Sequence, residues 1–181
     1  MLNLFNFKTQ PYSHQKTCLD NSWDKQTYAF FMEMGTGKTK VAIDNIGLLK
    51  LHKGISGVLI LAPKSVYTVW SVDEINKHMS PDVEYEIYAW NIDKPKQIQK
   101  SFNTKGKLKI FCMNVEALST PRGLKGALDF LTSHPNNLTI VDESTTIKNH
   151  KAIRTRNVLK LAKYSKYRRI LTGSPVTKSP L

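Results

Sequence analysis

The residues best suited to chemistry in this sequence form the run GTGKT at positions 35–39. Glycines allow backbone N–H groups to turn inward around phosphate oxygens, and the dipole of a helix that starts there adds to the attraction. Lys38 is placed to bridge the β- and γ-phosphates of a nucleotide, and the Thr39 hydroxyl to ligate the Mg²⁺ ion that these phosphates share. The run therefore predicts a nucleotide site whose binding residues are Met34, Gly35, Thr36, Gly37, Lys38 and Thr39.

One position departs from the full phosphate-loop pattern G-x-x-x-x-G-K-[ST]. The first glycine of that pattern would stand at position 32, where the chain has Met32. The alternative interpretation is a glycine-containing turn that is followed by Lys-Thr by chance. An apolar strand before the run and a helical period after it favour nucleotide binding over that alternative.

An acidic pair, Asp142 and Glu143, directly follows the apolar run at 138–141. On its own, such a pair is a helix cap or turn about half the time. Beside a phosphate loop it is typical of a Walker B motif: Asp142 would hold Mg²⁺ together with Thr39, mostly through the water shell of the ion, and Glu143 would orient and deprotonate the attacking water. The predicted catalytic residues are therefore Lys38, Asp142 and Glu143.

Apolar runs alternate with segments of helical period along the chain, which predicts an α/β fold with a parallel sheet covered by helices on both faces. Strands are predicted at 28–31, 57–62, 83–90, 108–113, 138–141 and 169–172. Helices are predicted after the glycine run with a stop at Gly54, after a cap at Ser65, at 93–102, at 124–131 and around 158–162. Because ligands bind at the carboxyl ends of parallel strands, Asp142 and Glu143 are expected at the ligand-binding edge of the sheet.

Composition and charge limit the number of domains and the kind of partner that this protein can have. At 181 residues and 40% hydrophobic, the chain (1–181) has the material for a single domain and no second one. Lys and Arg number 27 against 14 acidic residues, and a net charge of +13 favours a polyanion such as nucleic acid, the alternative being a generally basic, solvated surface. Candidate phosphate contacts are Lys64, Lys148, Arg154, Arg156, Lys160, Lys163, Lys166, Arg168 and Arg169.

The cysteines, the apolar stretches and the tryptophans further limit the class of protein. Cys18 and Cys112 have no partner at metal-ligand spacing, and no apolar stretch is long enough to span a membrane. We therefore expect a soluble, cytoplasmic protein with no membrane partner. Trp70 and Trp90 have rings that could stack on bases, but Trp70 stands at core spacing with Val66, and neither tryptophan is assigned to a ligand.

The motifs and their order resemble those of superfamily 2 helicases and ATPases of the SWI/SNF type. The run MEMGTGKT is similar to the DEMGLGKT loop of that family, which also lacks the first glycine. LILAPKSVYTVW (59–70), VDESTTIKN (141–149) and LTGSPV (171–176) resemble further motifs of the family, so the likeness spans nearly the whole chain. It implies the N-terminal RecA-like lobe of a P-loop NTPase, with a mostly parallel sheet of about six to seven strands and helices on both faces.

The same resemblance implies roles for residues outside the glycine run. Gln15, in PYSHQ, is similar to a glutamine that reads the adenine edge, and an amide suits this because it donates and accepts at once. Lys64 and Ser65 match positions that contact a nucleic-acid backbone. The coupling of γ-phosphate loss to lobe movement would fall to Thr172, Gly173 and Ser174.

Thr145 stands where the family has a histidine that links the ATP site to the coupling motif. A threonine hydroxyl can form a hydrogen bond but cannot carry charge. We therefore expect hydrolysis to be retained through Asp142 and Glu143, while the coupling is altered.

The family resemblance implies a DNA-stimulated ATPase and helicase, or DNA translocase, that uses ATP and Mg²⁺, with double-stranded DNA favoured over single-stranded DNA. Its relatives close ATP against a second RecA-like lobe, which supplies arginines worth roughly 10³ to 10⁵ in rate in related hydrolases. The chain ends at Leu181, before any second lobe, so poor turnover by this lobe alone is expected. Two alternatives stay open: a non-hydrolysing, single-lobe module that binds DNA or a partner, and the motor part of a restriction system.

Overall fold

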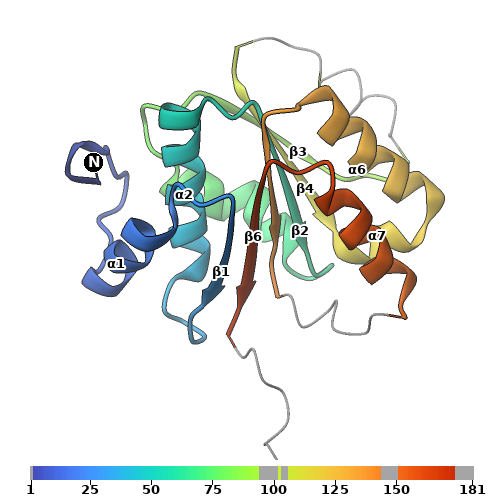
Figure 1. Cartoon of the computed structure of the whole chain (residues 1–181), viewed down its shortest axis with the longest axis horizontal. Coiled ribbons are helices and arrows are strands. Elements are labelled where there is room, and N and C mark those ends of the chain that lie inside the picture. The colour runs from blue at the N-terminus through green and yellow to red at the C-terminus, as the bar shows by residue number, and fades with distance from the viewer. Residues whose placement is uncertain (1, 94–101, 103–105, 144–150, 174–181) are drawn as a thin grey trace, which may run out of the picture.

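The structure is a computed structural model and describes residues 2–93, 102, 106–143 and 151–173. Within these residues, six strands form one sheet in the order β1-β6-β5-β2-β4-β3, and every neighbouring pair is parallel (Figure 1). The strands are β1 (Thr27–Phe31), β2 (Gly57–Ala62), β3 (Tyr85–Ala89), β4 (Leu108–Asn114), β5 (Asn137–Val141) and β6 (Tyr167–Thr172). The predicted α/β fold is confirmed.

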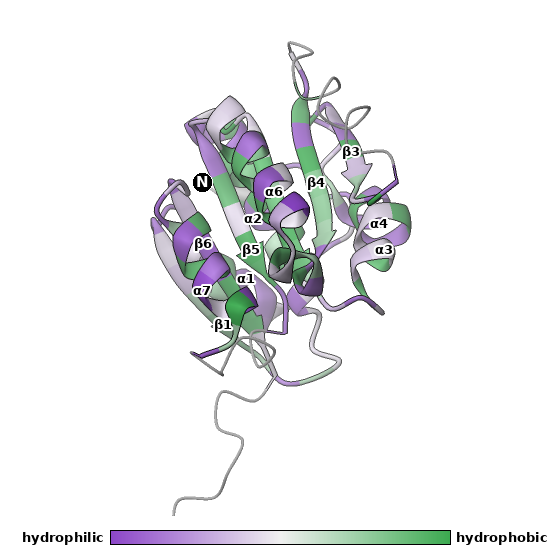
Figure 2. Cartoon of the chain, turned by 90° about the vertical axis from the view of Figure 1, so that its right-hand side faces the viewer, coloured by the Kyte–Doolittle hydropathy of each residue, from purple (hydrophilic) through white to green (hydrophobic). Residues whose placement is uncertain are grey.

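Helices cover both faces of this sheet (Figures 1 and 2). One face carries α1 (Ser13–Ser22), α2 (Lys38–Lys53), and three consecutive short pieces: α3 (Tyr67–Val69), the π-helical turn η2 (Trp70–Glu74) and α4 (Ile75–His78). The other face carries η3 (Val115–Ser119), α6 (Pro121–Ser133) and α7 (Ile153–Ala162). A 3-10 turn, η1 (Leu2–Leu4), begins the described chain. None of the described helices is both long and apolar enough to cross a lipid bilayer.

Strand β2 shows how the sequence pattern builds the two halves of the core. All six of its residues are buried, as expected of a central parallel strand with both faces covered. Val58 and Ile60 belong to the apolar cluster under α2, whereas Leu59 and Leu61 belong to the cluster under α6. Successive side chains of a strand point to opposite faces, so one continuous apolar run supplies both layers.

Several predicted boundaries are confirmed and others are wrong. Gly54 ends α2 in the left-handed conformation (φ +65°), as predicted. Ser65 does not cap a helix: the helix begins at Tyr67, and its N-cap residue Val66 makes no side-chain hydrogen bond. Helix α6 starts earlier than predicted because Thr120 accepts a hydrogen bond from the Gly123 N–H (3.1 Å).

A strand is predicted at 83–90, and the observed strand β3 is shorter, spanning Tyr85–Ala89. The predicted helix at 93–102 lies outside the described residues, except for Asp93 and Phe102 at its two ends.

A buried ion pair lies in the first turns of α2. Lys40 Nζ is 2.5 Å from Asp44 Oδ2, and the two side chains are 8% and 0% exposed. Burial raises the pKa of Asp44 from 3.8 to about 6, although the hydrogen bond and charge of Lys40 oppose the change. The folded state therefore holds this proton to higher pH than the unfolded chain, so this group lowers the free energy of unfolding as the pH rises from about 4 to about 6.

We expect Lys40→Met to lower the free energy of unfolding at pH 7 by about 3–5 kcal/mol, because it leaves the buried Asp44 carboxylate unpaired. The loss should shrink as the pH is lowered, since a protonated Asp44 carries no charge. Urea unfolding at pH 7 and pH 5 measures both effects.

Lys125→Met is the matched control, because Lys125 and Asp129 have the same spacing on α6 and the Lys125 side chain is 71% exposed. It should cost at most about 0.5 kcal/mol. An equal loss of unfolding free energy in the two variants would show that burial does not make the Lys40–Asp44 pair more costly to break.

Candidate functional site

The glycine loop, residues 32–37, joins the end of β1 to the start of α2. Gly35 (φ +80°) and Gly37 (φ +83°) adopt the left-handed conformation that favours glycine. The Thr36 hydroxyl and the Lys38 ammonium group both donate to the carbonyl oxygen of Glu33, at 2.7 and 3.2 Å. The loop therefore curls around the Lys38 side chain at the N-terminus of α2, as a phosphate cradle requires.

Gln15 braces the glycine loop from α1. Its Nε2 donates to the carbonyl oxygen of Thr36 (3.0 Å), and its Oε1 accepts from the Tyr12 N–H (3.0 Å). The side chain is 3% exposed, and a Cβ added to Gly37 would lie only 2.3 Å from Gln15 Nε2. The structure thus brings Gln15 to the loop, while adenine reading by this amide stays a prediction.

The acidic pair lies at the carboxyl end of β5. The Asp142 N–H donates to the Leu61 carbonyl oxygen (2.8 Å), which extends the contact between β5 and β2 by one residue. The Glu143 N–H donates to Asp142 Oδ1 (2.9 Å), and Glu143 has a φ of +50°, uncommon for a residue with a side chain. Backbone strain of this kind is concentrated at functional sites.

Trp70 is a site residue that sequence reasoning missed. Its indole Nε1 donates to Asp142 Oδ2 (2.8 Å), and the ring is 1% exposed. Burial raises the pKa of Asp142, and the hydrogen bond from Trp70 opposes that shift. The apolar spacing correctly predicted that Trp70 packs in the core. No spacing rule could have paired its N–H with Asp142, a residue 72 positions away.

A cavity of about 420 Å³ joins the glycine loop to the acidic pair. Residues predicted for ATP and Mg²⁺ line it: Gly35, Gly37, Lys38, Thr39, Asp142 and Glu143. The rest of its wall consists of Lys40 of α2, Val66 before α3, and Glu74, Lys77 and His78 of η2 and α4. The chain thus brings the predicted catalytic residues together from β5 and α2.

The donor set of this cavity fits Mg²⁺. Thr39 and Asp142 offer oxygen ligands, and the described residues contain no cluster of three or more His, Cys, Asp or Glu side chains that would form an all-protein cage. Magnesium keeps several waters and shares its shell with substrate phosphates, so two protein oxygens beside a phosphate cradle suit it.

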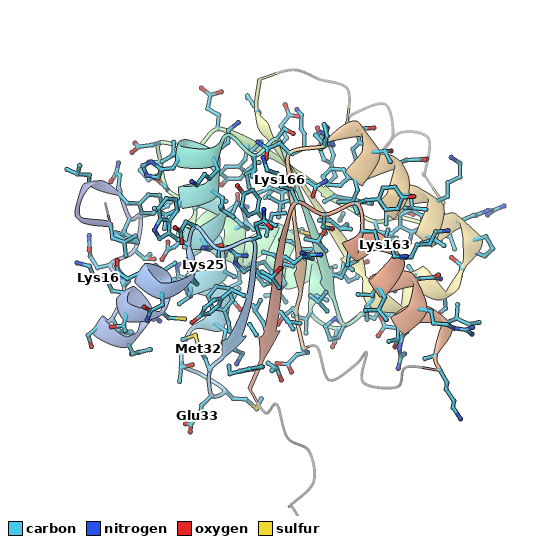
Figure 3. All side chains as sticks on the ribbon, viewed as in Figure 1. Lys16, Lys25, Met32, Glu33, Lys163 and Lys166 are labelled. Carbon is cyan, nitrogen blue, oxygen red and sulfur yellow. The ribbon has the colours of Figure 1, made fainter. Side chains whose placement is uncertain are left out.

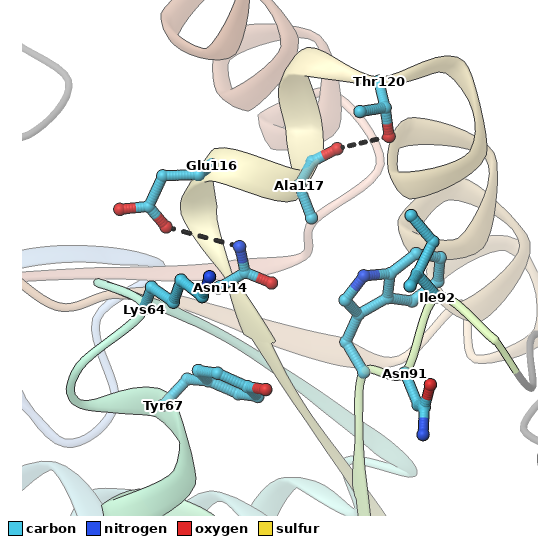
Figure 4. A pocket seen from close by; sticks show the side chains of 9 residues that line it. Lys64, Tyr67, Asn91, Ile92, Asn114, Glu116, Ala117 and Thr120 are labelled. Atoms are coloured by element: carbon cyan, nitrogen blue, oxygen red, sulfur yellow. Dashed lines mark hydrogen bonds between the residues drawn. The ribbon is translucent and has the colours of Figure 1, made fainter.

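Lys64 lines a second cavity, of about 530 Å³, at the carboxyl ends of β2, β3 and β4 (Figure 4). Tyr67, Trp90, Asn114 and Thr120 are further residues of its wall. Ser65 is exposed beside Lys64 but does not line the cavity. Lys148 lies outside the described residues.

Thr172 and Gly173 lie against the glycine loop. The Met32 N–H donates to the carbonyl oxygen of Thr172 (3.3 Å), and a Cβ added to Gly173 would lie 3.1 Å from Met34 Cγ. This contact suits the predicted coupling role, which stays a prediction. Ser174 and Thr145 lie outside the described residues.

Among the described residues, the basic side chains come from several elements of the fold. Figure 3 labels Lys16 and Lys25 near α1, and Lys163 and Lys166 around α7 and β6. The prediction that Arg169 is a phosphate contact is wrong. Its side chain is 1% exposed, and its guanidinium donates to Asn45 Oδ1 (3.0 Å) and to the Ser22 carbonyl oxygen (3.1 Å). Arg169 follows several basic residues in the sequence, but it is a core residue.

An all-parallel α/β sheet, with a glycine loop after β1 and an acidic pair after β5 on one cavity, defines the class of protein as a RecA-like lobe. The model of the SNF2-related domain family matches residues 14–180. The chain therefore belongs to the SNF2-related domain family, and it is a motor domain of the ATPase and helicase type. No curated protein sequence matches it.

Two solved structures share this fold. The Sulfolobus solfataricus SWI2/SNF2 ATPase core in complex with dsDNA is 22% identical, with a TM-score of 0.67 over 94% of this chain. A nuclease-deletion mutant of the Type ISP restriction-modification enzyme LlaGI, in complex with a DNA substrate mimic, is 15% identical, with a TM-score of 0.69 over 94% of this chain. The chain spans 33% of the first protein and 18% of the second.

We expect Gly37→Ala to weaken nucleotide binding more than Gly35→Ala does. Both substitutions force a side chain into a left-handed backbone, at about 1–2 kcal/mol each. Only the Gly37 methyl group would also displace Gln15, because nothing lies within 4 Å of a Cβ at Gly35.

Titration with a fluorescent ATP analogue should show a further loss of roughly tenfold in affinity for Gly37→Ala over Gly35→Ala. Urea unfolding of both variants separates this effect from global stability. Equal affinities would mean that contact with Gln15 does not shape the loop.

Proposed function

We propose that this chain is the ATP-binding lobe of a DNA-stimulated ATPase that moves on DNA and hydrolyses ATP to ADP and phosphate. One observation carries the proposal: Lys38 and Thr39 share a single cavity with Asp142 and Glu143. Phosphate-binding and water-activating groups must face the same γ-phosphate for hydrolysis, and the position of these four residues on one cavity supports the proposal.

The residues of the cavity divide the work of ATP hydrolysis. Backbone N–H groups of the glycine loop and the Lys38 ammonium group bind the phosphates, and Thr39 and Asp142 hold Mg²⁺. The ion, when bound, neutralises charge that develops on the phosphates. Glu143 orients the attacking water and accepts its proton, while Gln15 reads adenine beside the loop it braces.

Double-stranded DNA is the proposed partner. The net charge of +13 favours a polyanion, and the second cavity places Lys64 at the same edge of the sheet as the nucleotide cavity. The two similar solved structures contain dsDNA and a DNA substrate mimic. Lys64, Ser65 and Lys148 are the proposed backbone contacts, and the protein would act in the cytoplasm on nucleic acid.

A second RecA-like lobe completes the proposed ATP site. Residues 1–181 form one lobe, and the similar solved proteins are several times longer than this chain. Arginines from a second lobe in the same polypeptide would stabilise the transferring phosphoryl group, which is worth roughly 10³ to 10⁵ in rate. Residues 1–181 alone should therefore turn ATP over slowly.

The decisive experiment measures phosphate release by the full-length polypeptide with and without dsDNA. We expect dsDNA to raise the rate, and both Lys38→Ala and Asp142→Asn to abolish it, because each removes a group that holds the phosphates or the metal ion. An unchanged rate with dsDNA would leave a plain ATPase. Nucleotide binding without any turnover would favour a non-hydrolysing module instead.

We expect Lys64→Ala to weaken dsDNA binding at every sequence and to reduce the slope of log affinity against log salt by about 1, the loss of one phosphate contact. Lys107→Ala is the matched control, since Lys107 is exposed at the opposite end of β4. Fluorescence anisotropy over a salt series measures both. Equal slopes for the two variants would remove Lys64 from the interface.

A motor of a restriction system is the second candidate. The fold similarity to a Type ISP restriction-modification enzyme favours it. A nuclease domain in the full-length polypeptide, detected as DNA cleavage that requires ATP, would decide for this candidate.

A further inference from the structure

We propose that Trp70 is a positioning residue for ATP hydrolysis: its indole N–H fixes the Asp142 carboxylate for Mg²⁺ and connects that carboxylate to the wall of the second cavity. This inference rests on the proposed function, because it assigns Trp70 a role at the same metal-nucleotide site.

Both oxygens of the Asp142 carboxylate are held by N–H donors. Oδ2 accepts from Trp70 Nε1 at 2.8 Å, and Oδ1 accepts from the backbone N–H of Glu143 at 2.9 Å. Trp70 and Asp142 are 1% and 6% exposed, so this charge-assisted bond lies out of water, where it is stronger. Two fixed donors prevent rotation of the carboxylate, while each oxygen keeps a lone pair for an ion.

Trp70 also begins an irregular turn. Residues Trp70–Glu74 form a π-helical turn, in which the Ile75 N–H bonds to the carbonyl oxygen of Trp70. Such widened turns are rare and are found frequently at functional sites. Trp70 therefore has two features of a functional position, the carboxylate contact and the π-helical turn.

The segment that holds Trp70 borders both cavities. Lys64 and Tyr67 line the second cavity, and Tyr67 lies one helical turn before Trp70. Val66 and Glu74, on either side of Trp70 in the chain, line the nucleotide cavity. A polyanion that shifts Lys64 and Tyr67 would therefore move Trp70, and with it the Asp142 carboxylate.

A purely structural role for Trp70 makes a different prediction. Buried tryptophans usually find a hydrogen-bond partner for the indole N–H, and Asp142 would then be only that partner. In that case, removal of the N–H would change stability but not the metal dependence of nucleotide binding.

The test is Trp70→Phe in the full-length polypeptide, which keeps an aromatic ring in the core and removes the donor. Calorimetry would give the affinity for a non-hydrolysable ATP analogue with Mg²⁺ and with EDTA. We expect the Mg²⁺-dependent affinity to fall about tenfold, the loss of one charge-assisted hydrogen bond, and the metal-free affinity to change less than about twofold. The stimulation of ATP hydrolysis by dsDNA should fall as well.

Trp23→Phe is the control, since Trp23 contacts His52 and Lys53 and lines neither cavity. It should leave both affinities and the stimulation unchanged. In an Asp142→Asn background, Trp70→Phe should have no further effect on nucleotide affinity, because the carboxylate it positions is gone.

A second measurement keeps Trp70 in place in case Trp70→Phe does not fold. Residues 1–181 contain three tryptophans, so in this segment the double variant Trp23→Phe, Trp90→Phe keeps Trp70 as the one emitter. Its emission should change on addition of the nucleotide with Mg²⁺ and stay constant with the nucleotide in EDTA. Equal responses to the two would overturn the inference.

The outcomes separate the inference from the function on which it rests. If the wild-type protein binds no Mg²⁺-nucleotide, the proposed function is wrong and the role of Trp70 falls with it. If the wild-type protein binds and Trp70→Phe binds equally well, only the role of Trp70 is wrong.

Discussion

The parallel alignment of β1, β6, β5 and β2 is the constraint on which the site depends. Hydrogen-bonded parallel strands end at the same edge of a sheet, so segments far apart in the sequence meet there. Phe31 is paired with Thr172 and Val141 with Leu61, which brings the glycine loop, Thr172 and the acidic pair to one edge. A shift in register would move Asp142 along the sheet, away from Lys38.

Residues at that edge adopt irregular backbone conformations. Gly35 and Gly37 are left-handed, Glu143 has a positive φ, and Trp70 begins a π-helical turn. The positive φ of Glu143 costs free energy that the packed sheet and helices must offset, whereas glycine adopts the left-handed conformation without a steric penalty. Regular structure therefore supplies the stability, and the irregular backbone at the strand ends supplies the shape of the cavity.

Buried charged groups near the cavity also cost free energy that the rest of the fold must offset. Asp142 and the Lys40–Asp44 pair are almost fully removed from water, and burial raises the pKa of both carboxyl groups. Desolvation of charged groups opposes folding, and the hydrogen bonds that these carboxylates accept offset only part of the desolvation free energy. Arg169 instead uses its buried guanidinium to tie β6 to α1 and α2 through Ser22 and Asn45.

The sequence by itself determined the α/β class, the positions of the strands, the glycine loop and the acidic pair, because these depend on local period and on residues adjacent in the chain. Only the tertiary structure decided that Trp70 bonds to Asp142, that Gln15 braces Gly37, and that Arg169 is a core residue. These contacts join residues distant in sequence, and neither their spacing nor their residue type specifies a partner. The order of the strands in the folded sheet is what brings them together.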